Sequence, residues 1–465
     1  MKTHFIGICG VAMSALAIAF QKKNWKVTGS DAGFFPPIST HLEKNNIDFY
    51  PGWHPEKMGN PDLVVVGNVA SSTNPEWVYV QENKLNYKSY PEVIAQYFVK
   101  ENSIVCAGTY GKTSSSTLLS WILKESGYDP SYMFGGLSNN KIDSANIGDS
   151  KWSVLEGDEY KSSRWDNSPK FSHYSPTYLL LTSINWDHAD VYPTEQSYFD
   201  AFEKLIKSVP KNGLIVACTD DEKVKNLIEL ANSPIIKYGK NKDADYTYSD
   251  VKSSKDGLSF VISNKENNYE IGTEILGEYQ ASNITGSFAI AQQIGIEPDK
   301  IIKAIKTFKG IKRRLEKRYE NEITVFDDIA HSPQKAQSIL ETLRSTYTGK
   351  IFAIFEPNTG NRRPASFPGY ANTFEKADEV IIPRLTKVKI DPNDTETPAD
   401  GEKLTAIIKE THNNVNYIED DQKLINYLIN NTKKDDCIVF LGSHGFRGMI
   451  PQLIKQLKQN KQTEH

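Results

Sequence analysis

One stretch decides the fold of this chain, and it reads Ser103-Ile104-Val105-Cys106-Ala107-Gly108-Thr109-Tyr110-Gly111-Lys112-Thr113-Ser114. It starts as a short apolar strand, continues as a turn of small residues, and opens into a run at 115–124 that predicts a helix. Backbone N–H groups on such a turn converge on an anion, and the helix N-terminus adds partial positive charge. The stretch therefore predicts a phosphate-binding loop in which Lys112 reaches the β- and γ-phosphates and Thr113 holds Mg²⁺.

The loop departs from the general P-loop pattern, which has a Gly five residues before Gly111, where this chain has Cys106. What stands here is the shorter form Gly-Thr-Xaa-Gly-Lys-Thr. The alternative interpretation is a glycine turn followed by a surface lysine. The apolar strand before the turn and the predicted helix after it argue against that alternative.

The overall composition restricts the class of protein. A length of 465 residues suggests roughly three domains of about 150 residues. A net charge of −4 provides no basic surface for nucleic acid, and the four cysteines show no metal-type spacing. The sequence has neither a signal-peptide pattern nor an apolar run of about 18 residues. We therefore expect a cytoplasmic enzyme that acts on small molecules, binds no nucleic acid and does not insert into a membrane.

The N-terminal segment predicts a second nucleotide site. A strand at 3–8 leads through a glycine-rich turn into a helix at 12–23, and a second strand ends at Ser30-Asp31. This is a βαβ unit with an acid some 20 residues after its turn, where a ribose hydroxyl would be held. A third buried strand, 63–67, is followed by Asn68. The pattern favours binding of a nucleotide or pyrophosphate over a tight turn without a ligand.

Acidic residues follow two predicted strands of the middle segment. Glu156-Gly157-Asp158-Glu159-Tyr160 comes after the strand at 152–155, and Asp187-His188-Ala189-Asp190 comes after the strand at 178–182. Carboxylates gathered at strand ends repel one another unless a cation lies among them, and a histidine can ligate the same ion. We predict a metal site here; a solvated acidic loop and a structural histidine are the alternatives.

The remaining chain completes the predicted architecture. Strands at 323–326, 351–355, 379–382 and 437–441 alternate with helices, which predicts another doubly wound parallel sheet. Arg362-Arg363 is interpreted either as a solvated pair or as a carboxylate clamp. We expect an α/β protein with three domains: a Rossmann-like N-terminal domain, a central P-loop ATPase α/β domain and a C-terminal Rossmann-like domain, at 1–98, 99–311 and 312–465.

Several of these motifs together resemble one family, the Mur ligases, over essentially the whole chain. The loop at 108–113 is similar to their ATP loop, 156–160 to their acidic motif, and 187–190 to their Asp-His-x-Asp motif. Asn283 falls on an adenine-contacting Asn and Arg314 on a linker Arg, and 327–333 resembles a motif of their C-terminal domain. The resemblance implies that the enzyme needs ATP and Mg²⁺.

The resemblance implies a role for each matched residue. The implied catalytic residues are Lys112, His188, Arg314 and His331. The implied ATP-binding residues are Gly108, Thr109, Tyr110, Gly111, Lys112, Thr113, Ser114, Gln280, Asn283, Arg314 and Asp328. The implied UDP-sugar-binding residues are Gly7, Cys9, Gly10, Val11, Ala12, Ser30, Asp31 and Asn68. The implied metal ligands are Thr113, Glu156 and His188.

The resemblance also implies an activity. Within the family, the N-terminal domain resembles those that bind UDP-N-acetylmuramate, so the C-terminal domain would receive the amine. Lys170-Phe171-Ser172-His173-Tyr174 and Glu356-Pro357 resemble members that add L-alanyl-γ-D-glutamyl-meso-diaminopimelate during peptidoglycan recycling. Members that add L-alanine are the first alternative. A NAD-dependent oxidoreductase and a nucleotide-gated binding protein without catalysis are alternatives of other classes. We expect a monomer or a weak homodimer.

This chain departs from the family pattern at several positions. Ser183 replaces a usual Asn, and Lys161 replaces a usual acid. Gln280 takes the place of an Asn and Tyr279 that of a His. Some relatives carry a carbamylated lysine where this chain has Glu203, so we expect no carbamylation.

Overall fold

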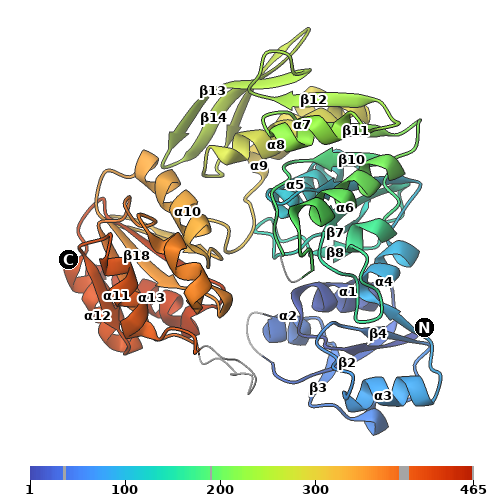
Figure 1. Cartoon of the computed structure of the whole chain (residues 1–465), viewed down its shortest axis with the longest axis horizontal. Helices are drawn as coiled ribbons and strands as arrows, with labels where there is room; N and C mark the ends of the chain where they lie inside the picture. Colours follow the sequence, from blue (N-terminus) through green and yellow to red (C-terminus); the bar gives the residue numbers. More distant parts are fainter. Residues whose placement is uncertain (35–37, 189–190, 387–396, 463–465) are drawn as a thin grey trace. The chain divides into compact units, whose positions relative to one another are not determined.

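The computed structural model describes residues 1–34, 38–188, 191–386 and 397–462 (Figure 1). The chain forms two compact units. Unit 1 comprises Met1–Val251, Ser259–Glu274 and Tyr279–Gly310. Unit 2 comprises Lys252–Leu258, Ile275–Glu278 and Ile311–His465. The division near 310 lies close to the predicted second boundary, while the three domains with their stated limits stay a prediction.

The N-terminal part of unit 1 is a parallel sheet of five strands in the order β3-β2-β1-β4-β5. Its strands are β1 (Lys2–Ile6), β2 (Lys26–Asp31), β3 (Asp48–Pro51), β4 (Leu63–Val66) and β5 (Tyr87–Ser89). Its helices are α1 (Val11–Lys22), α2 (Ile38–Lys44), α3 (Pro75–Glu82) and α4 (Tyr90–Tyr97), with a short 3-10 turn η1 (Pro55–Lys57). Every residue of β4 is buried, which explains its unbroken apolar run. The predicted βαβ unit is formed by β1, α1 and β2.

The rest of unit 1 is built on a ten-stranded sheet in the order β15-β14-β13-β12-β11-β10-β6-β9-β7-β8, of which the end of β13 and the start of β14 are assigned to unit 2. Its first strands are β6 (Asn102–Ala107), β7 (Ser131–Met133), β8 (Ala145–Asn146), β9 (Trp152–Gly157) and β10 (Tyr178–Leu181). The others are β11 (Leu214–Cys218), β12 (Ile235–Gly239), β13 (Tyr246–Ser254), β14 (Gly257–Asn264) and β15 (Asn268–Thr273). The helices are α5 (Lys112–Glu125), η2 (Lys170–His173), α6 (Glu195–Ser208), α7 (Glu222–Ile228), α8 (Tyr279–Gln293) and α9 (Pro298–Thr307). Because β6 pairs in parallel with both β9 and β10, the carboxyl ends of these three strands meet at one edge.

Unit 2 contains a six-stranded sheet in the order β16-β17-β21-β18-β19-β20, antiparallel only at its β16 edge. The strands are β16 (Glu316–Glu320), β17 (Thr324–Asp328), β18 (Ile351–Glu356), β19 (Glu379–Pro383), β20 (Val415–Ile418) and β21 (Cys437–Gly442). The helices are α10 (Pro333–Thr346), α11 (Gly401–Lys409), α12 (Asp421–Asn431) and α13 (Met449–Gln462). Short 3-10 turns are η3 (Gly360–Arg362), η4 (Pro364–Tyr370) and η5 (Phe446–Gly448). Alternating strands and helices around three sheets confirm the predicted α/β fold.

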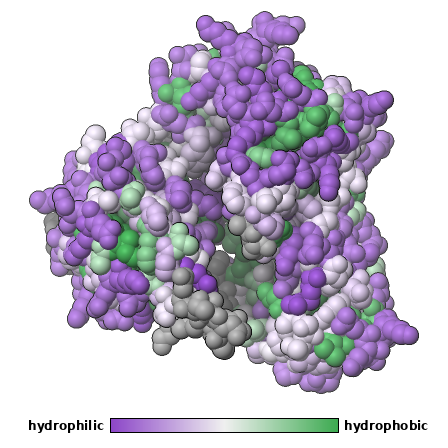
Figure 2. Space-filling model, in the orientation of Figure 1, coloured by the Kyte–Doolittle hydropathy of each residue, from purple (hydrophilic) through white to green (hydrophobic). Residues whose placement is uncertain are grey.

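The surface is polar for most of the face in Figure 2, where hydrophobic residues form small separate patches. Large apolar side chains that stay exposed are few, and two of them flank the candidate site: Tyr110 is 55% and Trp186 is 46% exposed. Among the residues that the structure describes, no helix combines the length and the apolar character needed to cross a bilayer.

Candidate active site

The predicted phosphate loop connects the end of β6 to α5, and two of its positions require glycine. Gly108 and Gly111 have φ angles of +134° and +84°. A Cβ at Gly108 would lie 2.2 Å from Thr182 Oγ1, and one at Gly111 would lie 2.4 Å from Asn283 Oδ1. Either distance is far below van der Waals contact, so no other residue fits without moving the loop. The loop therefore brings its backbone against β10 and α8.

Lys112 is folded back over its own loop. Its Nζ donates to the carbonyl oxygens of Gly108 at 2.6 Å and Thr109 at 3.2 Å, and to Glu159 Oε1 at 3.0 Å. Glu159 is 1% exposed, and its Oε2 lies 2.8 Å from the same Nζ without a hydrogen bond from any described residue. Burial raises the pKa of the Glu159 carboxyl, whereas the Lys112 charge acts in the opposite direction. Glu159 is thus the partner that holds the loop lysine.

The predicted metal ligands fall into two groups: Thr113 contacts Glu156, whereas His188 lies near Glu159. Thr113 donates its hydroxyl to Glu156 Oε1 at 2.8 Å, and Gly135 donates its N–H to the other oxygen of Glu156 at 2.5 Å. His188 has its Nε2 3.7 Å from Glu159 Oε1. The last two residues of the motif, Ala189 and Asp190, lie outside the described residues.

The residues present fit a magnesium ion with few protein ligands. Among the described residues, three or more His, Cys, Asp or Glu side chains gather nowhere in a way that could hold a metal. Mg²⁺ takes hard oxygen ligands and usually keeps several waters and substrate phosphates, so it needs only one or two protein ligands. The adjacent hydroxyl of Thr113 and carboxylate of Glu156 supply that chemistry at the start of the phosphate loop helix.

Neighbouring residues fix the loop and the two residues of α8 that are predicted to bind ATP. Ser183, a departure from the family pattern, accepts the Thr109 N–H through its carbonyl at 2.8 Å and the Tyr110 N–H through its hydroxyl at 3.1 Å. Gln280 and Asn283 are buried on one face of α8, and the Asn283 amide donates to Gln280 Oε1 at 3.0 Å. Asn283 also lies beside Gly111 of the loop.

The glycine-rich turn of the N-terminal sheet is tied to the predicted ribose acid. Gly7 has a φ of +88°, and Gly10 is the residue that precedes the first turn of α1. The Cys9 N–H donates to Asp31 Oδ2 at 2.8 Å, so the acid closes over the turn. Of the other predicted residues here, Val11 and Asn68 are exposed, Ala12 is half-buried and Ser30 is buried.

Sequence reasoning missed the role of Glu76 behind this turn. Its side chain is fully buried, and its carboxylate accepts the Ser30 hydroxyl, the Tyr50 hydroxyl at 2.9 Å and the His54 N–H at 2.8 Å. His4 Nε2 lies 3.5 Å from the same carboxylate. Burial acts to raise the pKa of Glu76, but the contact with His4 and the hydrogen bonds from Ser30 and the His54 N–H outweigh it, so this pKa is lowered. Its signal was a lone Glu at a helix start, which by itself indicates only a favourable interaction with the helix dipole.

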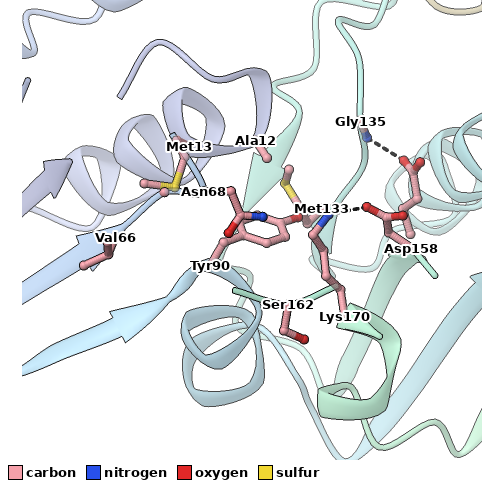
Figure 3. A pocket seen from close by; sticks show the side chains of 12 residues that line it. Ala12, Met13, Val66, Asn68, Tyr90, Met133, Gly135, Asp158, Ser162 and Lys170 are labelled. Carbon is pink, nitrogen blue, oxygen red and sulfur yellow. Dashed lines mark hydrogen bonds and ion pairs between the residues drawn. The ribbon is translucent and has the colours of Figure 1, made fainter. Parts of the chain in front are cut away.

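A pocket of about 190 Å³ connects the glycine-rich turn with the candidate metal ligand (Figure 3). Its lining comes from α1, from the end of β4 and the residues after it, from the start of α4, from the ends of β7 and β9 with the loops that follow them, and from the start of η2. The residues are Ala12, Met13, Val66, Gly67, Asn68, Tyr90, Met133, Gly135, Glu156, Asp158, Ser162 and Lys170. Only Ala12, Asn68 and Glu156 among them were predicted as site residues. Asp158 and Lys170 lie in motifs that the sequence analysis quoted, but it gave neither side chain a role.

In unit 2 the predicted linker arginine and its neighbour have different roles. Arg313 donates to Asp327 Oδ1 at 3.1 Å and to the carbonyls of Ser443 at 3.1 Å and His444 at 2.8 Å. It therefore anchors the linker to its own sheet, and Arg314 is exposed beside it.

Asp328 and His331 follow the end of β17. Asp328 is buried and accepts the N–H groups of Leu315 at 2.5 Å and Ala330 at 2.7 Å. His331 Nδ1 lies 2.7 Å from the Ile329 carbonyl, which can only accept, so this nitrogen carries the proton. Burial lowers the pKa of His331, which leaves it neutral at pH 7 with Nε2 as its unprotonated nitrogen.

The residues that follow β18 include Arg362, for which one of the two sequence-based interpretations is wrong. Arg362 is 8% exposed and donates to the carbonyls of Ala399 at 2.8 Å and Thr386 at 2.9 Å, so a solvated arginine pair is wrong for this residue. Its guanidinium is occupied by backbone and cannot act as a free clamp. Instead, Arg447 lies 3.4 Å from the buried Glu356 and pairs with Asp421 at 2.9 Å.

Burial of Asp328 gives a pH dependence of stability with a definite sign. Burial raises the pKa of Asp328 to about 6, above its value of about 3.9 in an unfolded chain. The folded state therefore binds more protons between these values, and the free energy of unfolding falls as pH rises from about 4 to 6, by up to about 3 kcal/mol. Calorimetry of the wild type and Asp328→Asn over this range should give diverging melting temperatures. Parallel pH profiles of the two proteins would contradict this assignment.

Comparison with known proteins places the site in a family. Three family models match in order: the Mur ligase family catalytic domain at residues 2–100, the Mur ligase middle domain at 106–291, and the Mur ligase glutamate ligase domain at 313–444. A UDP-N-acetylmuramate–L-alanine ligase from Acetivibrio thermocellus is 30% identical over 95% of this chain and 92% of that relative. The chain belongs to the Mur ligase family. Members of this family are ATP-dependent ligases that form amide bonds, so this chain is an ATP-dependent ligase and not an oxidoreductase.

Two further relatives share the name UDP-N-acetylmuramate–L-alanyl-gamma-D-glutamyl-meso-2,6-diaminoheptandioate ligase. The one from Haemophilus influenzae is 27% identical over 98% of this chain and 99% of its own length. The one from Escherichia coli is 28% identical over 100% of both chains. The crystal structure of a murein peptide ligase from Psychrobacter arcticus is 26% identical, covers 98% of both chains and has a TM-score of 0.71. A UDP-N-acetylmuramate–alanine ligase from Thermotoga maritima shares the fold, with a TM-score of 0.80 at 21% identity over 99% of this chain and 100% of that one.

Proposed function

We propose that this ligase joins the carboxylate of UDP-N-acetylmuramate to the amine of L-alanyl-γ-D-glutamyl-meso-diaminopimelate, releasing ADP and phosphate, in peptidoglycan recycling. The observation that carries the proposal is the match, over 98–100% of this chain, to two relatives named for that reaction. The proposed partners are these small molecules alone. Because ATP and nucleotide sugars are cytoplasmic metabolites, the proposal includes a cytoplasmic location, and a monomer or weak homodimer.

The chemistry requires activation of the acid. A carboxylate does not acylate an amine at neutral pH because its oxygen is a poor leaving group, and transfer of the γ-phosphoryl group from ATP converts it into an acyl phosphate. In the proposal, Lys112 and Arg314 neutralise charge on the transferring group. The amine then attacks uncharged, and phosphate leaves from the tetrahedral intermediate. The neutral His331, with an unprotonated Nε2, has the form needed to accept the amine proton.

The proposal includes Mg²⁺. Thr113 and Glu156 would hold one ion, and His188 would be a ligand of a second ion. When bound, such an ion stabilises charge on the phosphoryl oxygens. Lys112 would exchange Glu159 for the phosphates of ATP, and the buried Glu159 would remain beside His188. The remaining predicted ATP and UDP-sugar residues keep the roles that the family resemblance implies.

The second candidate reaction is the addition of L-alanine to the same UDP-sugar. It is favoured by relatives named UDP-N-acetylmuramate–L-alanine ligase, which reach 30% identity with this chain. Both reactions use the same acid and the same activation by ATP, so they differ only in the amine.

A comparison of amines decides between the two. With ATP, Mg²⁺ and UDP-N-acetylmuramate, we expect kcat/KM for ADP release to be at least about tenfold higher with the tripeptide than with L-alanine, a difference of about 1.4 kcal/mol. Tripeptide whose α-amine is acetylated serves as the matched control and should give only background release. A preference for free L-alanine would contradict the proposal and support the alternative reaction, the addition of L-alanine.

A further inference from the structure

We propose that the Lys170 ammonium binds the carboxylate of the acceptor sugar nucleotide and holds it in the pocket beside Glu156. The inference rests on the proposed function, because it takes the acceptor to be a nucleotide sugar with a carboxylate. Family resemblance had placed Lys170 only in a stretch that distinguishes two kinds of relative. Its position in the lining of the pocket supports a specific role, the binding of the acceptor carboxylate.

The position of the pocket defines what must occupy it. One end is lined by Ala12 and Met13 of α1, directly after the glycine-rich turn expected to hold the pyrophosphate. The other end reaches Glu156, which is bonded to Thr113 of the phosphate loop. A sugar acid whose pyrophosphate lies at α1 must place its carboxylate at the Glu156 end, where the γ-phosphoryl group is to be transferred.

Charge at that end opposes the ligand unless a cation is present. Glu156 and Asp158 both line the pocket, and an incoming carboxylate would be repelled by each. Lys112 is engaged by Glu159 and two loop carbonyls. Lys170 is the one cationic side chain among the described residues that line the pocket.

The Lys170 side chain is already directed at this place. Its Nζ lies 2.5 Å from Asp158 Oδ2 and 5.5 Å from the centre of the Tyr160 ring, and its side chain is 16% exposed (Figure 3). An ammonium group has three donors, so it can keep Asp158 and still donate to a ligand carboxylate. Asp158 is therefore a positioning residue, and the ion pair keeps the lysine in place before the substrate arrives.

The loop that delivers Lys170 is fixed at several points. Lys170 donates its N–H to the Tyr160 carbonyl at 3.1 Å, and the Phe171 N–H donates to the Asp158 carbonyl at 3.2 Å. At the tip of the loop, Trp165 stacks on Trp77 of α3 with ring centres 5.1 Å apart. A lysine held on a fixed loop loses little entropy on binding, which favours a specific contact.

Binding of two nearly identical ligands tests the role. In titration calorimetry without ATP, wild type should bind UDP-N-acetylmuramate at least about tenfold more tightly than its carboxyl methyl ester, because a charge-assisted hydrogen bond is lost with the ester. In Lys170→Met this ratio should fall to within about twofold, while the affinity for the ester stays as in wild type. Lys161→Met removes the same charge from the same loop at a position outside the pocket lining, and it should keep the wild-type ratio.

The outcomes separate the inference from the function beneath it. An equal loss of affinity for acid and ester in Lys170→Met would mean that the lysine only maintains the loop, and an unchanged ratio would mean that it does not contact the carboxylate; either overturns the inference. A wild type that binds neither ligand would overturn the proposed function itself. Retention of ester binding by Lys170→Met also shows that the variant is folded.

Discussion

Replacement of Lys112 by alanine is expected to reduce ATP-dependent phosphate release by about 10³-fold, to background, while UDP-sugar binding persists. The reason is that Lys112 is the one cationic residue in the sequence of the loop at 108–114, and its ammonium lies over the carbonyls of Gly108 and Thr109. UDP-sugar affinity should be retained because the glycine-rich turn belongs to a different sheet. Phosphate release and calorimetric titration with UDP-N-acetylmuramate measure the two effects separately.

The same substitution should also cost stability, which provides an internal control. Without Lys112, the 1% exposed Glu159 carboxylate loses its cation, and the free energy of unfolding should fall by about 1–3 kcal/mol. In Lys112→Ala/Glu159→Gln the buried charge is gone as well, so stability should recover while phosphate release stays at background. Activity within tenfold of wild type in either variant would refute the role of Lys112. Simultaneous loss of UDP-sugar binding would count against separate sites.

Local patterns predicted those parts of the fold that depend on neighbours in sequence. An apolar strand, two glycines and Lys-Thr specify the phosphate loop, because the positive φ angles at Gly108 and Gly111 and the start of α5 are local requirements. The βαβ unit at the N-terminus follows from the same reasoning. The pairing of Gln280 with Asn283 follows from their spacing of three in a helix, although their burial within α8 does not.

Contacts between segments that are distant in the sequence could not be predicted from the sequence alone. Glu159 meets Lys112 and His188 only after three strands have been aligned, and the sequence offered no reason to prefer it to Glu156 as the neighbour of His188. Glu76 accepts the hydroxyl of Ser30, which lies 46 residues earlier in the chain. Arg362 reads as a surface charge in sequence, yet the fold buries it against carbonyls. In each case the role of a polar side chain depends on a partner that is distant in the sequence, and a single sequence does not reveal that partner.

The second large effect is expected for Glu156→Gln. The amide keeps the size of the side chain, and its oxygen can still accept the Gly135 N–H while its nitrogen donates to the Thr113 hydroxyl, so the local structure should survive. Loss of the carboxylate charge removes the harder of the two oxygen ligands proposed for Mg²⁺. We expect ADP release at low Mg²⁺ to fall by more than about 100-fold, because the loss of a direct ligand should cost more than the about 10–100-fold cost of losing an outer-shell partner.

Titration with Mg²⁺ distinguishes a metal role from a structural one for Glu156. If the carboxylate holds the ion, the half-saturating Mg²⁺ concentration of Glu156→Gln should rise and activity should recover partly at high Mg²⁺, whereas misfolding would not respond to the metal. Glu101→Gln is the matched control, because Glu101 is exposed and pairs only with Lys151, at 3.0 Å, among the described residues. It makes the same change of charge and should leave the curve unaltered. An identical Mg²⁺ dependence in wild type and Glu156→Gln would exclude Glu156 as a ligand and move the ion to the pair formed by Glu159 and His188.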